Sequence, residues 1–335
     1  MVLRDSLGID IKFEEDSIKT YKIVRNGDYV AHLRSFQGGF AFSDKTGVCS
    51  PAYTILRPSE TISYGFLKPY FMSRKFIDSL RIVTYGIRDG KSISVEEWLK
   101  LYTCIPKKNE QQKISKFLRL IDNRIETQKK VIEKYESLIK GISNKLLFAD
   151  KGIPVRLGDI LLERSERTKV NNQHEVLSST VKGIFSQREY FSKEIASENN
   201  IGYKIIHLHD VVLSPQNLWM GNINYNDKYD IGIVSPSYKI FSIAEGYDKL
   251  FVSALLKTHR ALYNYMLVSE QGASVVRRNL NMEAFEQLVF KMPSIDKQRE
   301  VGNAISALQS RIELAIRVKT AYEKQKQWLL TEMFI

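Results

Sequence analysis

The stretch QQKISKFLRLIDNRIETQKKVIEKYESLIKGISNKLLF, residues 111–148, is matched by QREVGNAISALQSRIELAIRVKTAYEKQKQWLLTEMFI, residues 298–335. Both stretches begin five residues after a proline, Pro106 in the first and Pro293 in the second. Apolar residues recur in both at intervals of three and four, which predicts a helix with a coiled-coil seam. A helix of this length spans about 57 Å. That is more than one small domain needs, so we expect the two helices to pack on each other.

The seam is more regular in the first helix than in the second. In the first it consists of Ile114, Leu118, Ile121, Ile125, Ile132, Tyr135, Ile139, Ile142 and Leu146, with Gln128 in one polar position. In the second it consists of Val301, Ile305, Leu308, Ile312, Ala315, Tyr322, Leu329 and Met333. Lys319 and Lys326 interrupt the second seam, so its C-terminal half is expected to pack less tightly or to lie partly exposed. A pseudo-dyad would make the helices antiparallel with one globular domain toward each end; the alternative is that each helix docks on its own domain.

The repeat extends beyond the helices. Tyr21-Lys22-Ile23 recurs as Tyr203-Lys204-Ile205, and the Ser-Pro-Ala-Tyr that begins at Ser50 recurs as the Ser-Pro-Ser-Tyr that begins at Ser235. One continuous alignment with small insertions is typical of a duplicated domain. Residues 149–182 have no counterpart in the first copy. The first globular unit is therefore expected to lack its opening segment.

The sequence predicts a mixed α/β (α+β) fold in four parts. These are a first globular domain at 1–105, a long helix within 106–150, a second globular domain at 151–292 and a second long helix within 293–335. Stretches 21–33, 47–56, 203–215 and 231–243 alternate β-branched and aromatic residues with polar ones between turn residues, as half-buried strands do.

The bulk properties favour a polyanionic partner. The chain has 335 residues and a formal net charge of +12, with a pI near 9.4, which attracts nucleic acid or an acidic membrane equally well. Cys49 and Cys104 stand far apart, so neither a disulfide framework nor a zinc ribbon is expected. The N-terminus carries charge too early for a signal peptide, and no apolar run reaches membrane-spanning length. These features predict a cytoplasmic protein with no membrane partner.

Sequence motifs for catalysis are mostly missing. The chain contains no G-x-x-x-x-G-K-[ST], H-E-x-x-H or G-x-S-x-G. His207 and His209 would share one face of a strand, but no third ligand stands nearby, so no metal site is expected. The S-P-x-Y stretches at Ser50 and Ser235 loosely resemble the N-P-P-Y element of amino-methyltransferases. They lack the amide or carboxylate that holds the target amine, so each is interpreted as a turn that leads into a strand.

Two pairs of loops occupy equivalent positions in the copies but differ in content. They are 34–39 against 216–221, and 85–92 against 272–279. A repeated framework with unlike loops is what two readers of different DNA targets would have, because Arg, Asn and Gln distinguish base edges. The candidates for DNA contact are Arg34, Gln37, Arg88, Lys91, Gln216, Asn217, Trp219, Arg277, Arg278 and Asn279. Arg164, Arg167 and Lys169 are candidates for phosphate contact. Any single one could instead belong to an ordinary solvated loop.

The ordered duplication resembles the specificity subunit of type I restriction-modification systems over the whole chain. The resemblance is carried by a proline, a glutamine and an apolar end in each long helix. In the first copy these are Ile105-Pro106, Gln111 and Leu146-Leu147-Phe148, and in the second they are Met292-Pro293, Gln298 and Met333-Phe334-Ile335. Leu157-Gly158-Asp159-Ile160 is similar to the opening of that family's second target-recognition domain. The start of the chain departs from the family, because the first recognition domain should open with a similar segment. A shortened gene or an incorrect start codon would produce that departure.

The resemblance implies a subunit without catalytic activity that reads a bipartite site in double-stranded DNA. Two modification subunits would dock along the helix pair and methylate adenine, and restriction subunits would join them. The chain itself would need no cofactor, because S-adenosylmethionine would belong to the modification subunits. Two other functions stay open from the sequence. One is a coiled-coil adaptor that contacts only proteins, and the other is a stand-alone methyltransferase, which the missing cofactor motif disfavours.

Overall fold

The computed structural model describes residues 1, 15–32, 39–85, 92–144, 152–190, 199–271 and 278–334. The chain forms two compact units. The first comprises Met1–Val131 and Ala315–Ile335, and the second comprises Ile132–Leu314. Each unit therefore combines one globular region with part of each long helix. The predicted division into four segments at 105, 150 and 292 stays a prediction.

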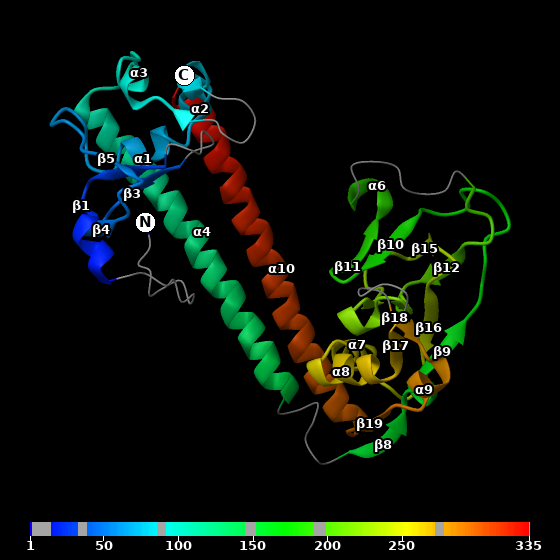
Figure 1. Ribbon diagram of the computed structural model, residues 1–335. Coiled ribbons are helices and arrows are strands. Elements are labelled where there is room, and N and C mark those ends of the chain that lie inside the picture. The colour runs from blue at the N-terminus through cyan, green and yellow to red at the C-terminus, as the bar shows by residue number, and fades with distance from the viewer. Residues whose placement is uncertain are drawn as a thin grey trace. The chain divides into compact units, whose positions relative to one another are not determined.

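The long helices are α4, Lys108–Ile142, and α10, Ile295–Glu332. In the first unit, Lys326 Nζ of α10 lies 2.6 Å from Asp122 Oδ1 of α4, and Arg124 Nη1 donates to Tyr322 Oη at 2.8 Å. In the second unit, Ile139 of α4 packs against the core that contains the early part of α10. Late residues of one helix thus meet early residues of the other. The predicted antiparallel pairing is confirmed within each unit (Figure 1).

In the C-terminal half of α10 the seam residues Tyr322, Leu329 and Met333 are half-buried, as expected, but two other residues near its end are buried. Leu330 and, just beyond the helix, Phe334 are only 2% and 7% exposed, and both belong to the core of the first unit. The Phe334 ring lies 6.0 Å from that of Phe66. Lys326 does not open the interface, because its ammonium is paired with Asp122. An ion pair can fill a seam position where an apolar residue was expected.

The first unit is built on a three-stranded antiparallel sheet in the order β3-β2-β5. Its elements in the described ranges are η2 (Glu15–Thr20), β1 (Lys22–Val24), β2 (Tyr29–Ala31), β3 (Phe40–Phe42), β4 (Gly47–Cys49), β5 (Thr54–Leu56), α1 (Leu67–Tyr70), α2 (Arg74–Leu80), η3 (Arg81–Val83), β6 (Thr84–Tyr85), β7 (Ser92–Ile93) and α3 (Val95–Leu99). Strands β1 and β4 form a separate antiparallel pair, as do β6 and β7.

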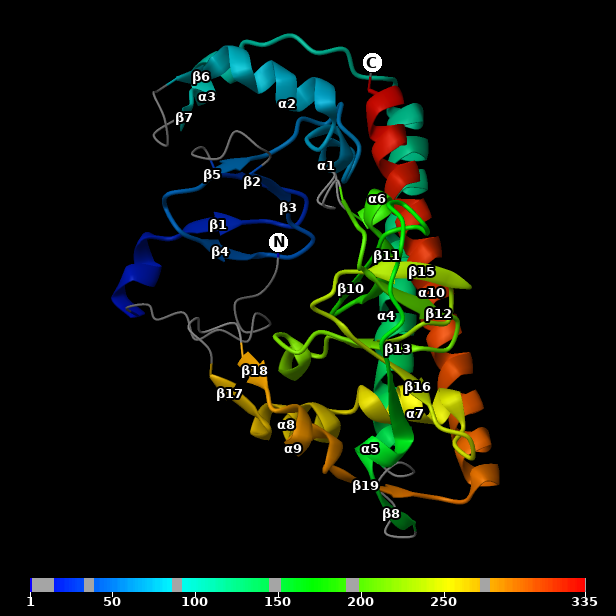
Figure 2. The same ribbon diagram turned by 90° about the vertical axis from the view of Figure 1, so that its right-hand side faces the viewer.

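The core of the first unit follows from the alternation of side chains along β2. Tyr29 points to the helices and lies 5.3 Å, ring to ring, from Phe71, which in turn contacts Phe76 at 4.7 Å. Val30 points to the other side and packs with Val24 and Cys49 of the β1–β4 pair. The sheet therefore separates an aromatic core beneath the helices from a small second core (Figure 2).

The second unit repeats this plan and adds strands to it. Its elements in the described ranges are β8 (Ile153–Arg156), α5 (Leu157–Ile160), β9 (Leu161–Arg164), β10 (Leu177–Thr180), β11 (Gly183–Ser186), α6 (Gln187–Tyr190), β12 (Lys204–His207), β13 (Val211–Leu213), η6 (Leu218–Met220), β14 (Ile223–Tyr225), β15 (Ile231–Val234), β16 (Lys239–Ile243), α7 (Lys249–Leu256), α8 (His259–Leu267), β17 (Ser269–Gln271), β18 (Arg278–Leu280), α9 (Met282–Glu286) and β19 (Val289–Met292). Its main sheet has the order β14-β13-β16-β9.

Strand pairing in the two units keeps the same register. Lys22 faces Cys49 in β1–β4, and Lys204 faces Val234 in β12–β15. Likewise, β2 lies between β3 and β5 as β13 lies between β14 and β16. The duplication seen in the sequence is therefore a duplication of the fold. Strands β8 to β11 of the second unit have no counterpart among the described residues of the first.

The two S-P-x-Y stretches are turns that lead into strands, as predicted. Tyr53 N donates to Ser50 O at 3.2 Å before β5, and Tyr238 N donates to Ser235 O at 3.1 Å before β16. The carbonyl of each tyrosine accepts a lysine ammonium, from Lys22 at 2.7 Å and from Lys204 at 2.6 Å. The same local contact thus survives in both copies.

Candidate nucleic-acid interface

A buried glutamine ties the start of each long helix to its globular region. Gln111 and Gln298 are 2% and 3% exposed. Each side-chain amide donates to the carbonyl of the proline five residues earlier, at 2.9 Å and 2.8 Å. Each side-chain oxygen accepts a backbone N–H, from Ser63 at 2.7 Å and from Asp248 at 3.0 Å. The Pro-x-x-x-x-Gln pattern therefore fixes how each helix leaves its globular region.

The loop between β13 and β14 in the second unit is held in one shape by its own backbone. Ser214 N donates to Asn222 O at 3.0 Å, which closes the loop at its base. Leu218 is fully buried and anchors η6, while Gly221 takes a left-handed conformation with a φ of 95°. A side chain at such a φ is strained, which explains the glycine. Gln216, by contrast, is exposed.

Arg278, a predicted residue from a distant part of the sequence, meets Gln216 and Trp219 of this loop. The Arg278 guanidinium lies over the Trp219 ring, 5.4 Å from its centre. Arg278 N donates to Gln216 O at 3.2 Å, and its Nη1 donates to Met266 O at 3.2 Å and to Ser269 O at 3.4 Å. The Trp219 indole N–H is buried without a hydrogen-bond partner in the described structure. These contacts give Arg278 a supporting role, because it braces the loop against the β17–β18 hairpin.

Polar side chains remain exposed around this brace. Asn279 is exposed on β18, where its backbone lies opposite Glu270 of β17, and Asn217 is half-buried in the loop. Together with Gln216 they present amide groups, which are donors and acceptors at once. Groups of this kind can pair with the edges of bases.

Arg164, a predicted phosphate contact, is used inside the protein. Its Nη1 lies 3.3 Å from the buried Asp210 carboxylate, and its Nη2 lies 3.3 Å from Glu166. Glu166 also accepts from His207 at 2.8 Å, and that hydrogen bond lowers the pKa of the Glu166 carboxyl. Burial raises the pKa of Asp210, against the effect of Arg164. The positive charge of Arg164 is therefore already balanced by two carboxyl groups.

Arg167 and Lys169 follow the same strand and are exposed. Arg167 Nη1 donates to Gly202 O at 2.9 Å, which orients the guanidinium. Of the three predicted phosphate contacts, these two have charges that no described carboxylate neutralises. The remaining predicted residues lie outside the described residues; they are Arg34, Gln37, Arg88, Lys91 and Arg277.

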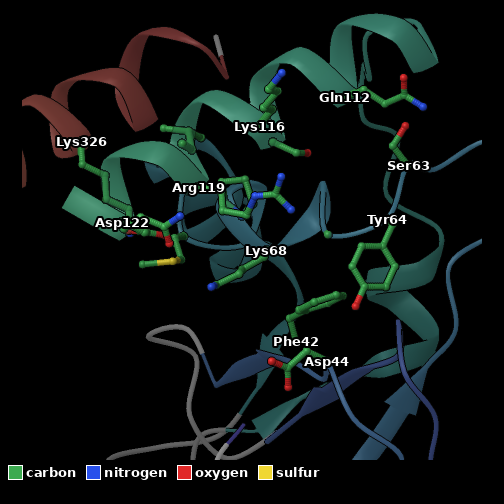
Figure 3. A pocket seen from close by; sticks show the side chains of 16 residues that line it. Phe42, Asp44, Ser63, Tyr64, Lys68, Gln112, Lys116, Arg119, Asp122 and Lys326 are labelled. Atoms are coloured by element: carbon green, nitrogen blue, oxygen red, sulfur yellow. The ribbon is translucent and has the colours of Figure 1, made fainter. Parts of the chain in front are cut away.

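A basic groove in the first unit was missed from the sequence. It has a volume of 510 Å³ and lies between α4, α1 and β3 (Figure 3). Lys116 and Arg119 come from one face of α4, and Lys68 comes from α1. The three-residue spacing of Lys116 and Arg119 places them on the same side of the helix, which is a signal the sequence did contain.

The second unit has a groove of 510 Å³ in the equivalent place. Ile305 and Gln309 line it where Leu118 and Asp122 line the first. Its charge differs, because the long helices contribute Lys140 and Glu136 to it, whereas they contribute Lys116, Arg119, Lys326 and Asp122 to the first groove. Burial also lowers the pKa of Lys257, its lysine from the globular region, to about 8. The position is repeated, whereas the chemistry is not.

The described part of the chain contains no cluster of three or more His, Cys, Asp and Glu residues that could hold a metal ion. No helix there is long and apolar enough to cross a membrane.

Comparison with known proteins bears on the fold. Neither the protein-family models nor the curated protein sequences yield a match. Among solved structures, the S subunit of a type I restriction-modification system from M. genitalium matches with a TM-score of 0.61 and 14% identity, over 94% of this chain and 84% of that one. A second match is a chain from a structure described as the structural basis of complex assembly and conformational transition of the type I R-M system. It has a TM-score of 0.53 and 12% identity, over 92% of this chain and 82% of that one. The predicted resemblance is confirmed for the architecture: the chain has the fold of a type I restriction-modification S subunit.

Proposed function

We propose that the chain is the DNA-recognition subunit of a type I restriction-modification system and reads a bipartite site in double-stranded DNA. The observation that carries this proposal is the fold shared with the M. genitalium S subunit over 94% of the chain. The basic net charge of +12 agrees with it. So does the contrast between a framework repeated in register and loops that differ in content.

In the second unit, the loop braced by Trp219 and Arg278 would enter a groove of the DNA. Gln216, Asn217 and Asn279 would meet base edges, since side-chain amides can form paired contacts with adenine. Arg167 and Lys169 would lie against the phosphate backbone, which positions the protein without reading sequence. Arg278 would act through the loop rather than by touching a base, because its Nη1 and backbone N–H are already engaged.

The long helices would serve as spacer and scaffold. Modification subunits would dock along them, methylate adenine and hold S-adenosylmethionine, and restriction subunits would join this assembly. The repeated groove beside α4 and α10 supports two equivalent docking positions. In this proposal the chain itself catalyses nothing.

DNA binding by the purified chain tests the proposal. We expect an electrophoretic shift of genomic DNA fragments that weakens as salt rises, because binding releases counterions. Methyl transfer should appear only when the modification subunit is added. Methylation by the chain alone would identify a methyltransferase, and failure to bind DNA at any salt concentration would favour a protein-only adaptor.

Single substitutions test the assignment of residues. Gln216→Ala should relax sequence preference at one base position and cost about 1 to 3 kcal/mol in binding. Arg167→Ala should weaken binding to all sequences alike and reduce the salt slope by about 1. Gln327→Ala and Arg317→Ala, exposed positions on α10, are the matched controls. Equal behaviour of each variant and its control would remove that residue from the interface.

A further inference from the structure

Two aliphatic side chains of the β1–β4 pair in the first unit are exposed, whereas their counterparts in the second unit are covered. Ile23 and Val48 face each other across this pair and are 64% and 53% exposed. Their counterparts Ile205 and Ile233 face each other in the same register and are 3% and 0% exposed. Contiguous exposed apolar patches mark interaction sites, whereas single exposed aliphatic residues are ordinary. The difference therefore lies in what covers the strands.

In the second unit the cover is a single stretch, residues 161–186. Its strand β9 pairs with the edge of β16. After β9, Glu166 O accepts from Ile205 N at 3.0 Å, and Glu175 O accepts from Ile233 N at 2.9 Å. Strands β10 and β11 then close over the small core through Leu177 and Ile184. Within the described first unit, the N–H groups of Ile23 and Val48 have no such acceptor, and β5 pairs only with β2.

Two equivalent glycines, Gly232 and Gly47, differ in their contact with residues 161–186 or their equivalent. A Cβ atom on Gly232 would lie 2.3 Å from the Leu177 side chain, so only glycine leaves room for this leucine. Gly47 occupies the same register position in β4, yet no described atom comes within 4 Å of its hypothetical Cβ. Neither glycine has a positive φ. The first unit thus keeps the recess for a large side chain in a place where no described side chain enters it.

The two units also differ in the segment directly before the long helix. In the second unit, β8 pairs with β19 directly before α10. The matching residues before α4, 102–105, form no strand, and Tyr102 is fully exposed. A cavity of 350 Å³ lies beside the small core, lined in part by Val30, Cys49 and Tyr53. All these differences lie at positions that residues 153–186 contact in the second unit.

We propose that this face of the first unit, formed by β1, β4 and the free edge of β5, is an acceptor site for a strand-forming segment of another polypeptide. The segment it fits has the chemistry of residues 153–186. It would place an aliphatic side chain on Gly47, pair its backbone with Ile23, Val48 and β5, and add a strand to the sheet. Strand addition of this kind uses backbone hydrogen bonds for affinity and side-chain recesses for selectivity. The inference rests on the two folds alone and does not depend on the proposed function.

A peptide covering residues 152–190, labelled with a fluorophore and added to the full chain, tests the proposal. Fluorescence anisotropy should show saturable binding. Hydrogen exchange should slow at the amides of Ile23 and Val48 and stay unchanged in β12 and β15. Gly47→Leu should weaken binding about tenfold or more, because the new side chain fills the recess. Gly141→Leu on α4, where a Cβ also meets nothing within 4 Å, should not.

The peptide itself supplies a second control. Leu177→Asp in the peptide should abolish binding, since a carboxylate would enter an apolar recess. Absence of saturable binding would overturn the proposal and would mean that the face is filled by other residues, such as 2–14. Equal binding by the Gly47→Leu chain would overturn it as well, because the peptide would then be bound elsewhere, for example in exchange with the native segment of the second unit.

Discussion

Asp28 in the first unit and Asp210 in the second occupy the same position in the same turn, but they meet their cations from different directions. Asp28 accepts from Arg25 N at 2.8 Å, and Asp210 accepts from His207 N at 2.7 Å. Asp28 is paired with Arg57, which follows β5, whereas Asp210 is paired with an arginine from β9. The turn requires a compensated carboxylate in both copies. The arginine that pairs with this carboxylate differs because the second unit has a fourth strand, β9, at the edge of its sheet.

The comparison separates two layers of each unit. The inner layer, which comprises the strand registers, the tyrosine turns and the buried glutamines, is the same in both copies. The outer layer, which comprises β8 to β11 and the loops, differs. We infer that the duplicated framework keeps its fold when the outer strands and loops change. Substitutions at equivalent positions of the two units would show how far this holds.

The largest effect is expected from removing the glutamine that both copies share. Gln298→Ala would leave the Asp248 N–H and the Pro293 carbonyl without their partner and would open a cavity. Together these should cost about 3 to 4 kcal/mol in the second unit. Gln111→Ala should cost a similar amount in the first. Hydrogen exchange, read separately for each unit, measures both values. Gln112→Ala, on the exposed neighbour of Gln111, should change neither.

The equivalent glycines should respond unequally to the same substitution. Gly232→Ala would drive a methyl group into the buried Leu177 side chain and should destabilise the second unit by about 2 kcal/mol. The methyl group of Gly47→Ala meets no described atom within 4 Å, so this substitution should be neutral or slightly stabilising, because alanine restricts the unfolded chain. Denaturant unfolding of the two variants measures the difference. A similar loss in both would show that the face around Gly47 is already covered.

The two arginines should differ in a similar way. Arg164→Ala leaves the buried Asp210 without its cation and should destabilise the second unit by about 1 to 2 kcal/mol. Arg57→Ala should have a smaller effect, since the Arg57 side chain is 57% exposed and water can replace it. Thermal unfolding at low and high salt measures both. If Arg57→Ala proves the more harmful, the first unit depends on this pair more than its exposure implies.

The smallest effect to measure is the titration of the two aspartates. The hydrogen bond from Arg57 lowers the pKa of Asp28 below its ordinary value, whereas burial raises the pKa of Asp210. The stability that Asp28 contributes is therefore present above its unfolded pKa and lost as pH falls through the folded one. Asp210 has the opposite sign, so its contribution is lost as pH rises from its unfolded pKa through the folded one. Carboxyl carbon chemical shifts followed against pH would show the two directions, and shifts of the same sign would contradict the comparison.

Much of the framework could be predicted from the sequence because its signals are local. The three-and-four spacing of apolar residues specifies a helix, and the repeat of that spacing specifies two. The S-P-x-Y turns were recognised for the same reason, since a proline and a serine constrain only their neighbours. The ion pair of Lys326 was not predicted, because its partner Asp122 lies across the helix pair, 204 residues away in sequence.

The loops of the candidate interface could be predicted from the sequence, but the contacts between their side chains could not. Gln216, Trp219 and Arg278 were selected separately, and their residue types gave no sign that Arg278 would brace the loop through Trp219. Arg164 was chosen for its charge, yet that charge is balanced by Asp210, which is 46 residues away. Charge can be counted along a chain, but its availability depends on which groups the fold places beside it.

By itself, the amino-acid sequence determined the duplication and the two helices. It favoured their antiparallel pairing, and its motifs resemble those of a specificity subunit. The duplication and the helices follow from periodicity and from the order of segments, which are properties of the chain as a line. Only the tertiary structure decided which arginine neutralises which aspartate, why Gly232 and Gly47 differ among the described residues, and which aliphatic side chains of the β1–β4 pair are exposed. Those properties depend on contacts between segments far apart in sequence, where burial and excluded volume act.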